Sequence, residues 1–513
     1  MSKPTFRLQP AVLLAFLLGA AASCDDTSSP ASISWSSCSL IDNKSDGLAE
    51  CATVSLPLDE TQTVPGTIGV FVKRLRAATQ PARGQVWFTE GGPGGAATYL
   101  LPPLMQLYAA KHPDLDMYAA DHRGTGGSEA LTCPDQEAAG LATADLIAAC
   151  GQVVSQQLGN RLPFFSTTES ARDLGRLIDL TREPGQKVFV TGASYATYHI
   201  LRYLQLYPVQ ADGIVLDGIL SPGSNFVNFD VDMNQVGQQL FASCAGDAVC
   251  SSKLGSDPWA TLVAVEDSFD QGHCPDLGVT SDEVRSFLGK MLYSRPLSDY
   301  IPALTYRAQR CAADDVTAIT YFSSKLQAAR ATPAGGFSLP LQMYIDVSEL
   351  WTYPTPGVPA VQAALDQTSI AVGASLATAM AADSWPRYNP APYARQWPST
   401  TVPLLMMNGG LDPATPLPAA LAAKDQFQGP NQTFVTFPDE GHGVEGQSPT
   451  DALWTHDCGF EIVGQFLADP AAQLDTSCLA NVLPLNFSGQ PAMNQYFWGT
   501  TDVWENPSAS SSH

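Results

Sequence analysis

Positive charge is scarce in this sequence. Its 513 residues contain 26 lysines and arginines against 50 aspartates and glutamates, which gives a formal net charge of −24. A nucleic-acid-binding protein needs a basic surface that neutralises phosphates, so we expect no nucleic-acid partner. Long apolar runs are also scarce, because no stretch after the N-terminal region is long enough to span a bilayer.

Closely spaced metal ligands are missing as well. The chain holds seven histidines and eleven cysteines, yet no CxxC or HxxxH pair occurs in it. Zinc sites are commonly built from such pairs, so the sequence predicts no metal site. The apolar content of 45% is ordinary for a globular protein, and no internal repeat is visible. The length fits one large α/β domain with insertions, or two to three domains.

The N-terminus has the pattern of a signal peptide over residues 1–23. Lys3 and Arg7 give a positive start, residues 11–18 form a short apolar run, and small residues follow. This pattern predicts an exported protein, either a bacterial cell-envelope lipoprotein or a secreted or periplasmic protein.

The cysteine count is odd, and Cys24 accounts for the odd one. It follows Ala-Ala-Ser, which is similar to a bacterial lipobox and predicts membrane attachment through a lipidated Cys24. The alternative is cleavage after Ala22, which leaves a free thiol. Ten cysteines then remain, and an exported chain is expected to pair them. Many connectivities are open, and we expect sequence-local pairs. These are Cys38–Cys51, Cys133–Cys150, Cys244–Cys250, Cys274–Cys311 and Cys458–Cys478.

Strand-like and helical patterns alternate along most of the chain, which predicts a parallel sheet flanked by helices. Strand patterns become rare between about 222 and 395, where amphipathic helical patterns predominate. The expected organisation is a signal peptide (1–23), a tether and lead-in (24–50), the first part of a sheet domain (51–221), a helical cap insertion (222–395), the second part of the sheet domain (396–485) and a frayed C-terminal tail (486–513).

The pattern of a nucleophile elbow occurs at residues 188–199. Apolar β-favouring residues run into Gly192, Ser194 follows two residues later, and a helical pattern begins. Such a turn holds a serine exposed between strand and helix, and it needs small flanking residues. Ala196 stands where this pattern has a second glycine. A Gly-x-Ser after a strand is also frequent by chance, so the elbow needs partners.

A serine nucleophile needs a base, and the base needs an orienting acid. His442 lies in a loop just after a late strand, whereas the other histidines lie in helical patterns, beside cysteines, in the tail or before the serine. Asp412 follows another strand and lies between Ser194 and His442 in chain order, as in α/β-hydrolases. Asp412 is alternatively a turn residue, and Asp439 on the histidine's own loop is a weaker rival.

A glycine-rich loop at 90–96 follows a strand and predicts an oxyanion hole. Glycines let backbone N–H groups approach a substrate. We expect Gly92 to supply one N–H, with Gly91 as the alternative, and Tyr195, next to the nucleophile, to supply the second. The alternative for the loop is a simple Gly-Pro turn. With these groups, acyl transfer through Ser194 requires no metal or organic cofactor.

Four segments together indicate a family: 91–95, 121–128, 192–197 and 411–443. With them the chain resembles the serine exopeptidases related to prolyl aminopeptidase and, more closely, the secreted bacterial tripeptidyl aminopeptidases. The resemblance covers nearly all of the expected exported chain except the middle of the insertion.

The resemblance implies an α/β-hydrolase fold with a helical cap and with a TAP-like region at 396–485. It implies that Ser194 is the nucleophile, Asp412 the acid and His442 the base. It also implies that Asp121 and Arg123 brace active-site loops. The chain departs from the family at Ala196, in place of glycine, and at Glu90, where relatives have histidine, asparagine or another residue.

The expected substrate is a peptide with a free N-terminus, which a monomeric enzyme recognises with carboxylates. Glu349 is our candidate, since the family has an acidic residue in this region, and Glu90 and Glu129 are further candidates. Glu349 is alternatively a solvated residue on a helix face. Two other functions stay open, an esterase or lipase on the same fold and a non-catalytic surface binding protein.

Overall fold

The computed structural model describes residues 33–41, 46–141, 143–329 and 336–505. The predicted signal peptide and Cys24 lie outside these residues, so both stay predictions. Within the described ranges, no helix is long and apolar enough to cross a membrane.

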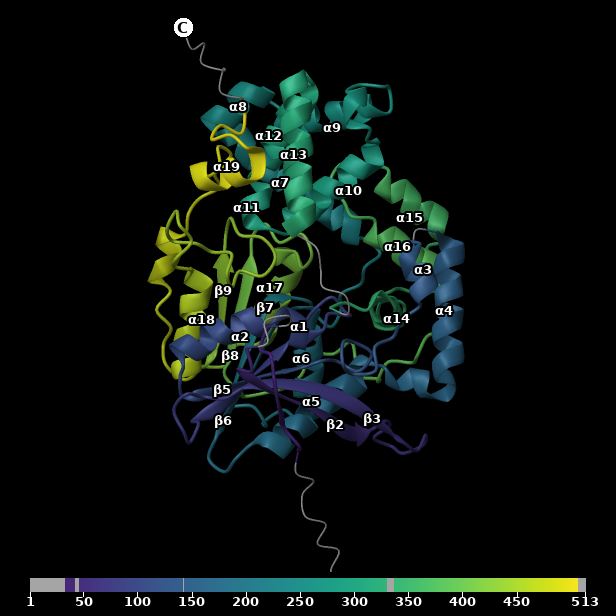
Figure 1. Cartoon of the computed structure of the whole chain (residues 1–513), viewed down its shortest axis with the longest axis vertical. Coiled ribbons are helices and arrows are strands. Elements are labelled where there is room, and N and C mark those ends of the chain that lie inside the picture. Colours follow the sequence, from purple (N-terminus) through teal and green to yellow (C-terminus); the bar gives the residue numbers. More distant parts are fainter. Residues whose placement is uncertain (1–32, 42–45, 142, 330–335, 506–513) are drawn as a thin grey trace, which may run out of the picture.

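A nine-stranded sheet forms the centre of the molecule, in the order β1-β2-β3-β5-β4-β6-β7-β8-β9 (Figure 1). The first three strands and the β3–β5 pair are antiparallel, and every pair from β5 to β9 is parallel. The prediction of a mostly parallel sheet is therefore confirmed. The strands are β1 (Ser36–Cys38), β2 (Ala49–Pro57), β3 (Thr67–Leu75), β4 (Gly84–Thr89), β5 (Leu115–Ala120), β6 (Lys187–Ser194), β7 (Gly213–Ile219), β8 (Leu404–Gly409) and β9 (Gln432–Phe437).

The central strands are buried on both faces, which explains their continuous apolar sequences. Val86 and Phe88 of β4 point into one core, and Trp87 between them points into the other. One face is covered by α1 (Ala97–Leu100), α2 (Pro102–Lys111) and α18 (Cys458–Ala468). The other face is covered by α5 (Thr167–Thr181), α6 (Tyr195–Leu206) and α17 (Leu417–Gln426), while α4 (Ala144–Leu158) packs against the helices that follow β7. The short helix α3 (Pro134–Ala138) precedes α4.

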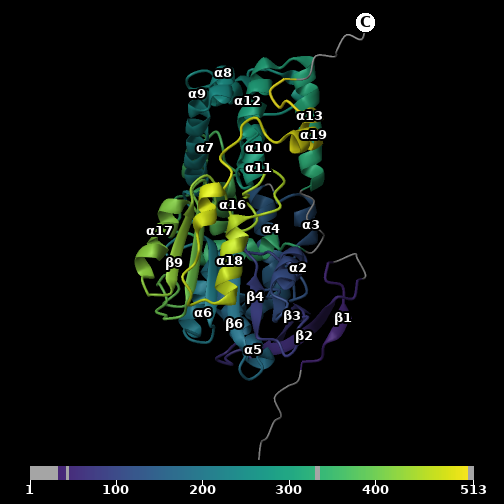
Figure 2. The same cartoon turned by 90° about the vertical axis from the view of Figure 1, so that its left-hand side faces the viewer.

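Ten α-helices lie between β7 and β8 in the described chain, where the sequence predicts the insertion. Helices α7 to α13 stack at one end of the sheet and form most of a cap (Figures 1 and 2). The helices are α7 (Phe229–Gly246), α8 (Ala248–Leu254), α9 (Pro258–Phe269), α10 (Ser281–Leu292), α11 (Arg295–Ser298), α12 (Ile301–Arg310), α13 (Ala313–Ala329), α14 (Leu339–Glu349), α15 (Val358–Leu365) and α16 (Ala374–Ala382).

The sequence predicts a frayed tail from residue 486 onward, and the structure corrects this expectation. The described part of this segment is folded onto the cap. Helix α19 (Pro491–Trp498) packs against α13, and the side chains of Trp498 and Trp504 are buried in the cap core. The aromatic residues of this polar stretch explain its order, since each removes a large apolar area from water. The lead-in also contains a short edge strand, β1, within the stretch expected to be a tether.

Five disulfides are present among the described residues, and all five are the pairs expected from the sequence. Two lie in the cap, Cys244–Cys250 and Cys274–Cys311, and three lie in the sheet domain. Such pairs persist in oxidising compartments, which is consistent with an extracellular protein.

Candidate active site

Ser194 lies at the junction of β6 and α6 in a strained backbone conformation. Its φ is 63° and its ψ is −132°, a region that residues with a side chain rarely occupy. Such strain is what a nucleophile elbow imposes. Gly192 is required here, because a Cβ on it would lie 2.5 Å from both the Cβ of Ala196 and the Oγ1 of Thr89. The departure at Ala196 is thus accommodated: its methyl group fills the space that Gly192 leaves empty.

His442 and Asp412 form a close pair beyond the ends of β9 and β8. The His442 Nδ1 lies 2.9 Å from Oδ1 and 3.0 Å from Oδ2 of Asp412. Since a carboxylate only accepts, Nδ1 carries the proton and Nε2 faces away with its lone pair. Asp412 is buried and also accepts the N–H groups of Ala414 and Thr415 and the Thr415 hydroxyl. The rival Asp439 makes no hydrogen bond to His442 in the described chain.

The charges around His442 favour its protonated form. Burial alone lowers the pKa of His442, but the negative charges of Asp412, Asp217 and Glu90 outweigh it, so its pKa lies above the usual value. A base of this kind holds the proton taken from a nucleophile more readily.

The three candidate triad residues lie at or just beyond the carboxyl ends of the parallel strands β6, β8 and β9. Ser194 is the register partner of Ile219 on β7. A Cβ on Gly218, one residue earlier, would lie 3.2 Å from Asp412 Oδ2 and 3.3 Å from His442 Cε1. The Ser194 hydroxyl and the imidazole are not hydrogen-bonded to each other among the described residues, and catalytic hydrogen bonds often tighten only when substrate binds.

The glycine loop, residues 90–96, lies directly against the elbow. A Cβ on Gly91 would be 2.9 Å from the Ala193 carbonyl and 3.1 Å from the Ser194 Cβ. The Gly91 N–H donates to Oε1 of Glu90 at 2.9 Å, so this donor is occupied. The Gly92 N–H has no acceptor among the described residues, and Gly92 has a φ of 114° that suits glycine. Gly92 is therefore the better placed of the two candidate oxyanion donors.

The cap contacts this loop through the chain just before α14. Gly95 and Phe337 form an isolated antiparallel bridge, and the Ser338 N–H donates to the Gly94 carbonyl at 2.9 Å. Ser338 also caps α14 by accepting the Leu341 N–H. Helix α14 and the side chains on it are thereby fixed relative to the oxyanion loop.

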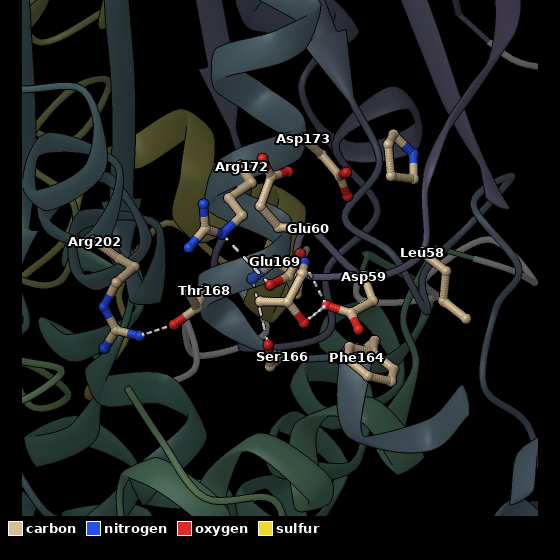
Figure 3. Close-up of polar contacts among 12 residues, drawn as sticks. Leu58, Asp59, Glu60, Phe164, Ser166, Thr168, Glu169, Arg172, Asp173 and Arg202 are labelled. Atoms are coloured by element: carbon tan, nitrogen blue, oxygen red, sulfur yellow. Dashed lines mark hydrogen bonds and ion pairs between the residues drawn. The ribbon is translucent and has the colours of Figure 1, made fainter. Parts of the chain in front are cut away.

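Glu349 on α14 is buried and fully engaged. Its Oε2 lies 3.0 Å from Arg202 Nη2 and accepts the Tyr198 hydroxyl at 2.8 Å, while Oε1 accepts the Tyr388 hydroxyl at 2.5 Å. Arg202 also donates to the Thr168 hydroxyl near the start of α5 (Figure 3). These contacts weigh against Glu349 as a substrate ligand, and against the alternative of a solvated helix-face residue.

Asp346, one turn earlier on α14, is an acidic residue that was not among the substrate-binding candidates predicted from the sequence. It is 4% exposed, and its Oδ1 has no hydrogen-bond partner among the described residues. Burial raises the pKa of Asp346 well above its usual value. Burial also raises the pKa of Tyr195, the residue after Ser194, and the nearby acidic groups Glu349 and Asp346 add to this shift. The sequence contains acidic residues at positions 346 and 349, but it does not indicate which of the two side chains has a partner in the fold.

Glu90 and Glu129 differ in their surroundings. Burial raises the pKa of Glu90 to about 7, and its charge interacts with His442. Glu129 forms a partly exposed ion pair with Arg161, with 2.9 Å between Oε2 and Nη2. Only Glu90 is placed beside the catalytic groups.

Asp121 and Arg123 each tie segments together, though they do not pair with each other. Asp121 accepts the N–H groups of Thr98 and Gly127, each at 2.9 Å. Arg123 pairs with Asp173 on α5 and donates to the carbonyls of Leu58 and Phe164. Figure 3 labels Asp173 on α5 together with Leu58 and Phe164 on the neighbouring segments.

A cavity of about 260 Å³ lies beside the loop that follows β8 and carries Asp412. Its wall runs from Ile219, the register partner of Ser194, to Asp232 on α7, and on the other side it includes Thr415. It therefore borders the residues that hold Asp412.

Comparisons with known proteins agree with the fold described above. A family described as TAP-like protein matches residues 369–478, a stretch that contains both Asp412 and His442. This match and the order of the strands in the sheet together identify the fold. The fold is that of the α/β-hydrolases. No curated protein matches the sequence.

Solved structures similar to this α/β-hydrolase are distant. A proline iminopeptidase from Mycobacterium smegmatis has 16% sequence identity and a TM-score of 0.39, covering 82% of this chain and 98% of that one. A carboxyl esterase from Bacillus coagulans has 13% identity and a TM-score of 0.37, covering 82% and 99%. An esterase from Exiguobacterium antarcticum has 13% identity and a TM-score of 0.31, covering 74% and 90%. Scores this low do not add to the assignment.

Proposed function

We propose that this protein is an exported serine hydrolase, and specifically an aminopeptidase that releases amino acids or short peptides from a free N-terminus. The observation that carries the proposal is the His442–Asp412 pair beside a strained serine elbow. An imidazole held by a buried carboxylate is the arrangement that activates a serine hydroxyl.

The mechanism is acyl transfer through an ester on Ser194. His442 removes the serine proton during attack on the scissile carbonyl and returns it to the leaving amine, while Asp412 holds the imidazole. The N–H groups of Gly92 and Tyr195 stabilise the oxyanion. In the second half of the reaction, His442 activates water and the ester is hydrolysed.

Recognition of a free N-terminus falls to Asp346. A substrate ammonium group needs a carboxylate that is not already paired, and Asp346 meets this requirement while Glu349 does not. Asp346 also lies close enough to Tyr195, next to the nucleophile, to influence the pKa of the Tyr195 hydroxyl. We retain a monomer anchored through a lipidated Cys24 as the proposed form in the cell envelope.

The second candidate function is an esterase or lipase, since the same fold and catalytic residues serve both reactions. Glu349 pairs with Arg202 instead of facing a ligand, and this observation favours the esterase by removing one predicted ammonium ligand.

Chromogenic aminoacyl, dipeptidyl and tripeptidyl amides with free and with blocked N-termini decide between the two. We expect cleavage of the free forms only, and the Ser194→Ala protein should be inactive. Equal cleavage of blocked amides would rule out an aminopeptidase, and cleavage of esters alone would establish the esterase. Full activity in Ser194→Ala, or no labelling of Ser194 by a fluorophosphonate, would remove the serine mechanism itself.

A further inference from the structure

A chain of hydrogen bonds runs from the interior of the sheet domain to the oxyanion loop. The Ser170 hydroxyl lies 2.8 Å from Nδ1 of His122, and Nε2 of His122 lies 3.0 Å from the backbone carbonyl of Glu90. A carbonyl only accepts, so Nε2 carries the proton and Nδ1 accepts from Ser170. Burial lowers the pKa of His122 to about 4, which keeps this ring neutral and its tautomer fixed.

The peptide between Glu90 and Gly91 is therefore held from both sides. In a trans peptide the carbonyl and the N–H point in opposite directions. His122 binds the carbonyl side, and the Glu90 carboxylate binds the Gly91 N–H at 2.9 Å. The Glu90 side chain is itself enclosed, because a Cβ on Gly95 would overlap its Cγ.

The next peptide depends on this one. Its carbonyl, that of Gly91, accepts the Gly95 N–H at 3.1 Å, and its N–H is the unpartnered one of Gly92. If Gly91 turned, the Gly92 N–H would turn with it. The carboxylate thus acts on the donor that the proposed mechanism uses, which is one residue along the chain from the N–H that it contacts.

We propose that Glu90 is a positioning residue of this hydrolase: its carboxylate holds the Gly91 N–H, so that the Gly92 N–H is directed to the oxyanion. This inference rests on the proposed serine mechanism, but not on the choice between peptides and esters. Under this proposal Glu90, the residue at which the chain departs from the family, affects the rate of the reaction and does not recognise the substrate amine, because its Oε1 already accepts the Gly91 N–H.

The charge of Glu90 gives the proposal a second readout. Three carboxylates raise the pKa of His442, namely Asp412, Asp217 and Glu90. The Tyr293 ring faces the imidazole from the cap, edge to face, and has no charge at neutral pH. Removing the Glu90 charge lowers the pKa of His442, so the acid limb of the activity profile moves to lower pH.

Hydrolysis of p-nitrophenyl acetate by the full chain tests the proposal with Glu90→Ala and Glu90→Gln. We expect Glu90→Ala to reduce kcat by roughly ten- to a hundred-fold with little change in KM, because a displaced oxyanion donor acts mainly on the transition state. Glu90→Gln should recover most of kcat, since an amide oxygen can accept the Gly91 N–H. Both variants should show the acid limb at lower pH.

An exposed residue, Glu183, provides the control, and Glu183→Ala should match the wild type. An unchanged kcat in Glu90→Ala would overturn the proposal, and so would a Glu90→Gln protein as slow as Glu90→Ala. If Glu90→Ala fails to fold by circular dichroism, the kcat and pH profile of Glu90→Gln still decide. Activity of Ser194→Ala on the same ester would instead mean that the proposed mechanism is wrong.

Discussion

Asp346 and Glu349 lie one turn apart on α14, both buried, and only Glu349 has a partner. Glu349 pairs with Arg202 at 3.0 Å, whereas Oδ1 of Asp346 contacts no hydrogen-bond donor among the described residues. Two carboxyl groups on one helix thus differ in their surroundings: one is satisfied by the protein, and the other has an oxygen with no donor among the described residues.

Replacing Asp346 with Asn should remove the preference for a free N-terminus. The ratio of kcat/KM for free over blocked amides should fall about ten-fold, since a hydrogen bond to a charged group contributes about 1.5–3 kcal/mol. Asp366→Asn, at an exposed position, serves as the control. A ratio unchanged by Asp346→Asn would assign recognition of the ammonium group to another residue.

Replacing Glu349 with Ala should destabilise the protein instead. It leaves the buried guanidinium of Arg202 without its counter-charge, which costs about 3–5 kcal/mol in such pairs. Urea unfolding followed by circular dichroism measures this loss. A double variant, Glu349→Met with Arg202→Leu, should recover stability, and a Glu349→Ala protein as stable as the wild type would contradict the structural role.

Replacing Asp412 with Asn should reduce kcat about 10⁴-fold, because the amide favours the wrong imidazole tautomer. The measurement is steady-state hydrolysis of a chromogenic ester. Asp439→Asn is the matched control, on the histidine's own loop, and should keep kcat within about two-fold, since within the described chain Asp439 makes no hydrogen bond to the imidazole. A large loss in Asp439→Asn with activity in Asp412→Asn would exchange the two assignments.

Stability should fall as pH rises from about 6.5 to 8. Burial raises the pKa of four glutamates, to about 7 for Glu90 and Glu266 and to about 8 for Glu440 and Glu445. The unfolded chain has released these protons by pH 6.5 while the folded one retains them, so the free energy of unfolding decreases with pH. His442, whose pKa is raised, acts in the same direction.

Buried histidines oppose this trend only at lower pH. The pKa values of His122 and His199 are lowered by burial, so their contribution to stability grows until the unfolded histidines lose their protons near pH 6.5. Thermal unfolding between pH 5 and 8 measures the balance. A melting temperature that rises steadily from pH 6.5 to 8 would show that these glutamates are ionised in the folded protein.

The two disulfides of the cap should contribute different amounts to the free energy of unfolding. Cys274–Cys311 closes a separation of 37 residues and Cys244–Cys250 one of 6. Replacing the first pair with serines should cost about 3–4 kcal/mol and the second less, because a longer loop loses more entropy when closed. Denaturant unfolding of the two double variants compares them, and equal losses would contradict this reasoning.

What the sequence predicted well depends on neighbours along the chain. The elbow at Ser194 was readable because its constraints come from Gly192 and Ala196, and the five disulfides were readable because each pair is local. The mostly parallel sheet followed from alternating patterns.

Contacts between distant segments were not readable. Arg202 and Glu349 are 147 positions apart, and nothing in either stretch indicates that their side chains meet. The same holds for Trp498 and Trp504, whose polar surroundings suggested fraying while their rings complete a core on the cap. Asp346 could not be separated from Glu349 without knowing which face of α14 meets Arg202.

The packing of the C-terminal segment also orders events during synthesis. The apolar core of the cap includes Phe487, Phe497 and Trp498, which leave the ribosome after the whole sheet domain. Domains otherwise begin to fold from the N-terminus as the chain emerges. Here the cap core is complete only after the C-terminal segment has been synthesised, so a chain released before about position 498 lacks part of that core. Proteolytic removal of this segment would likewise expose apolar surface of the cap.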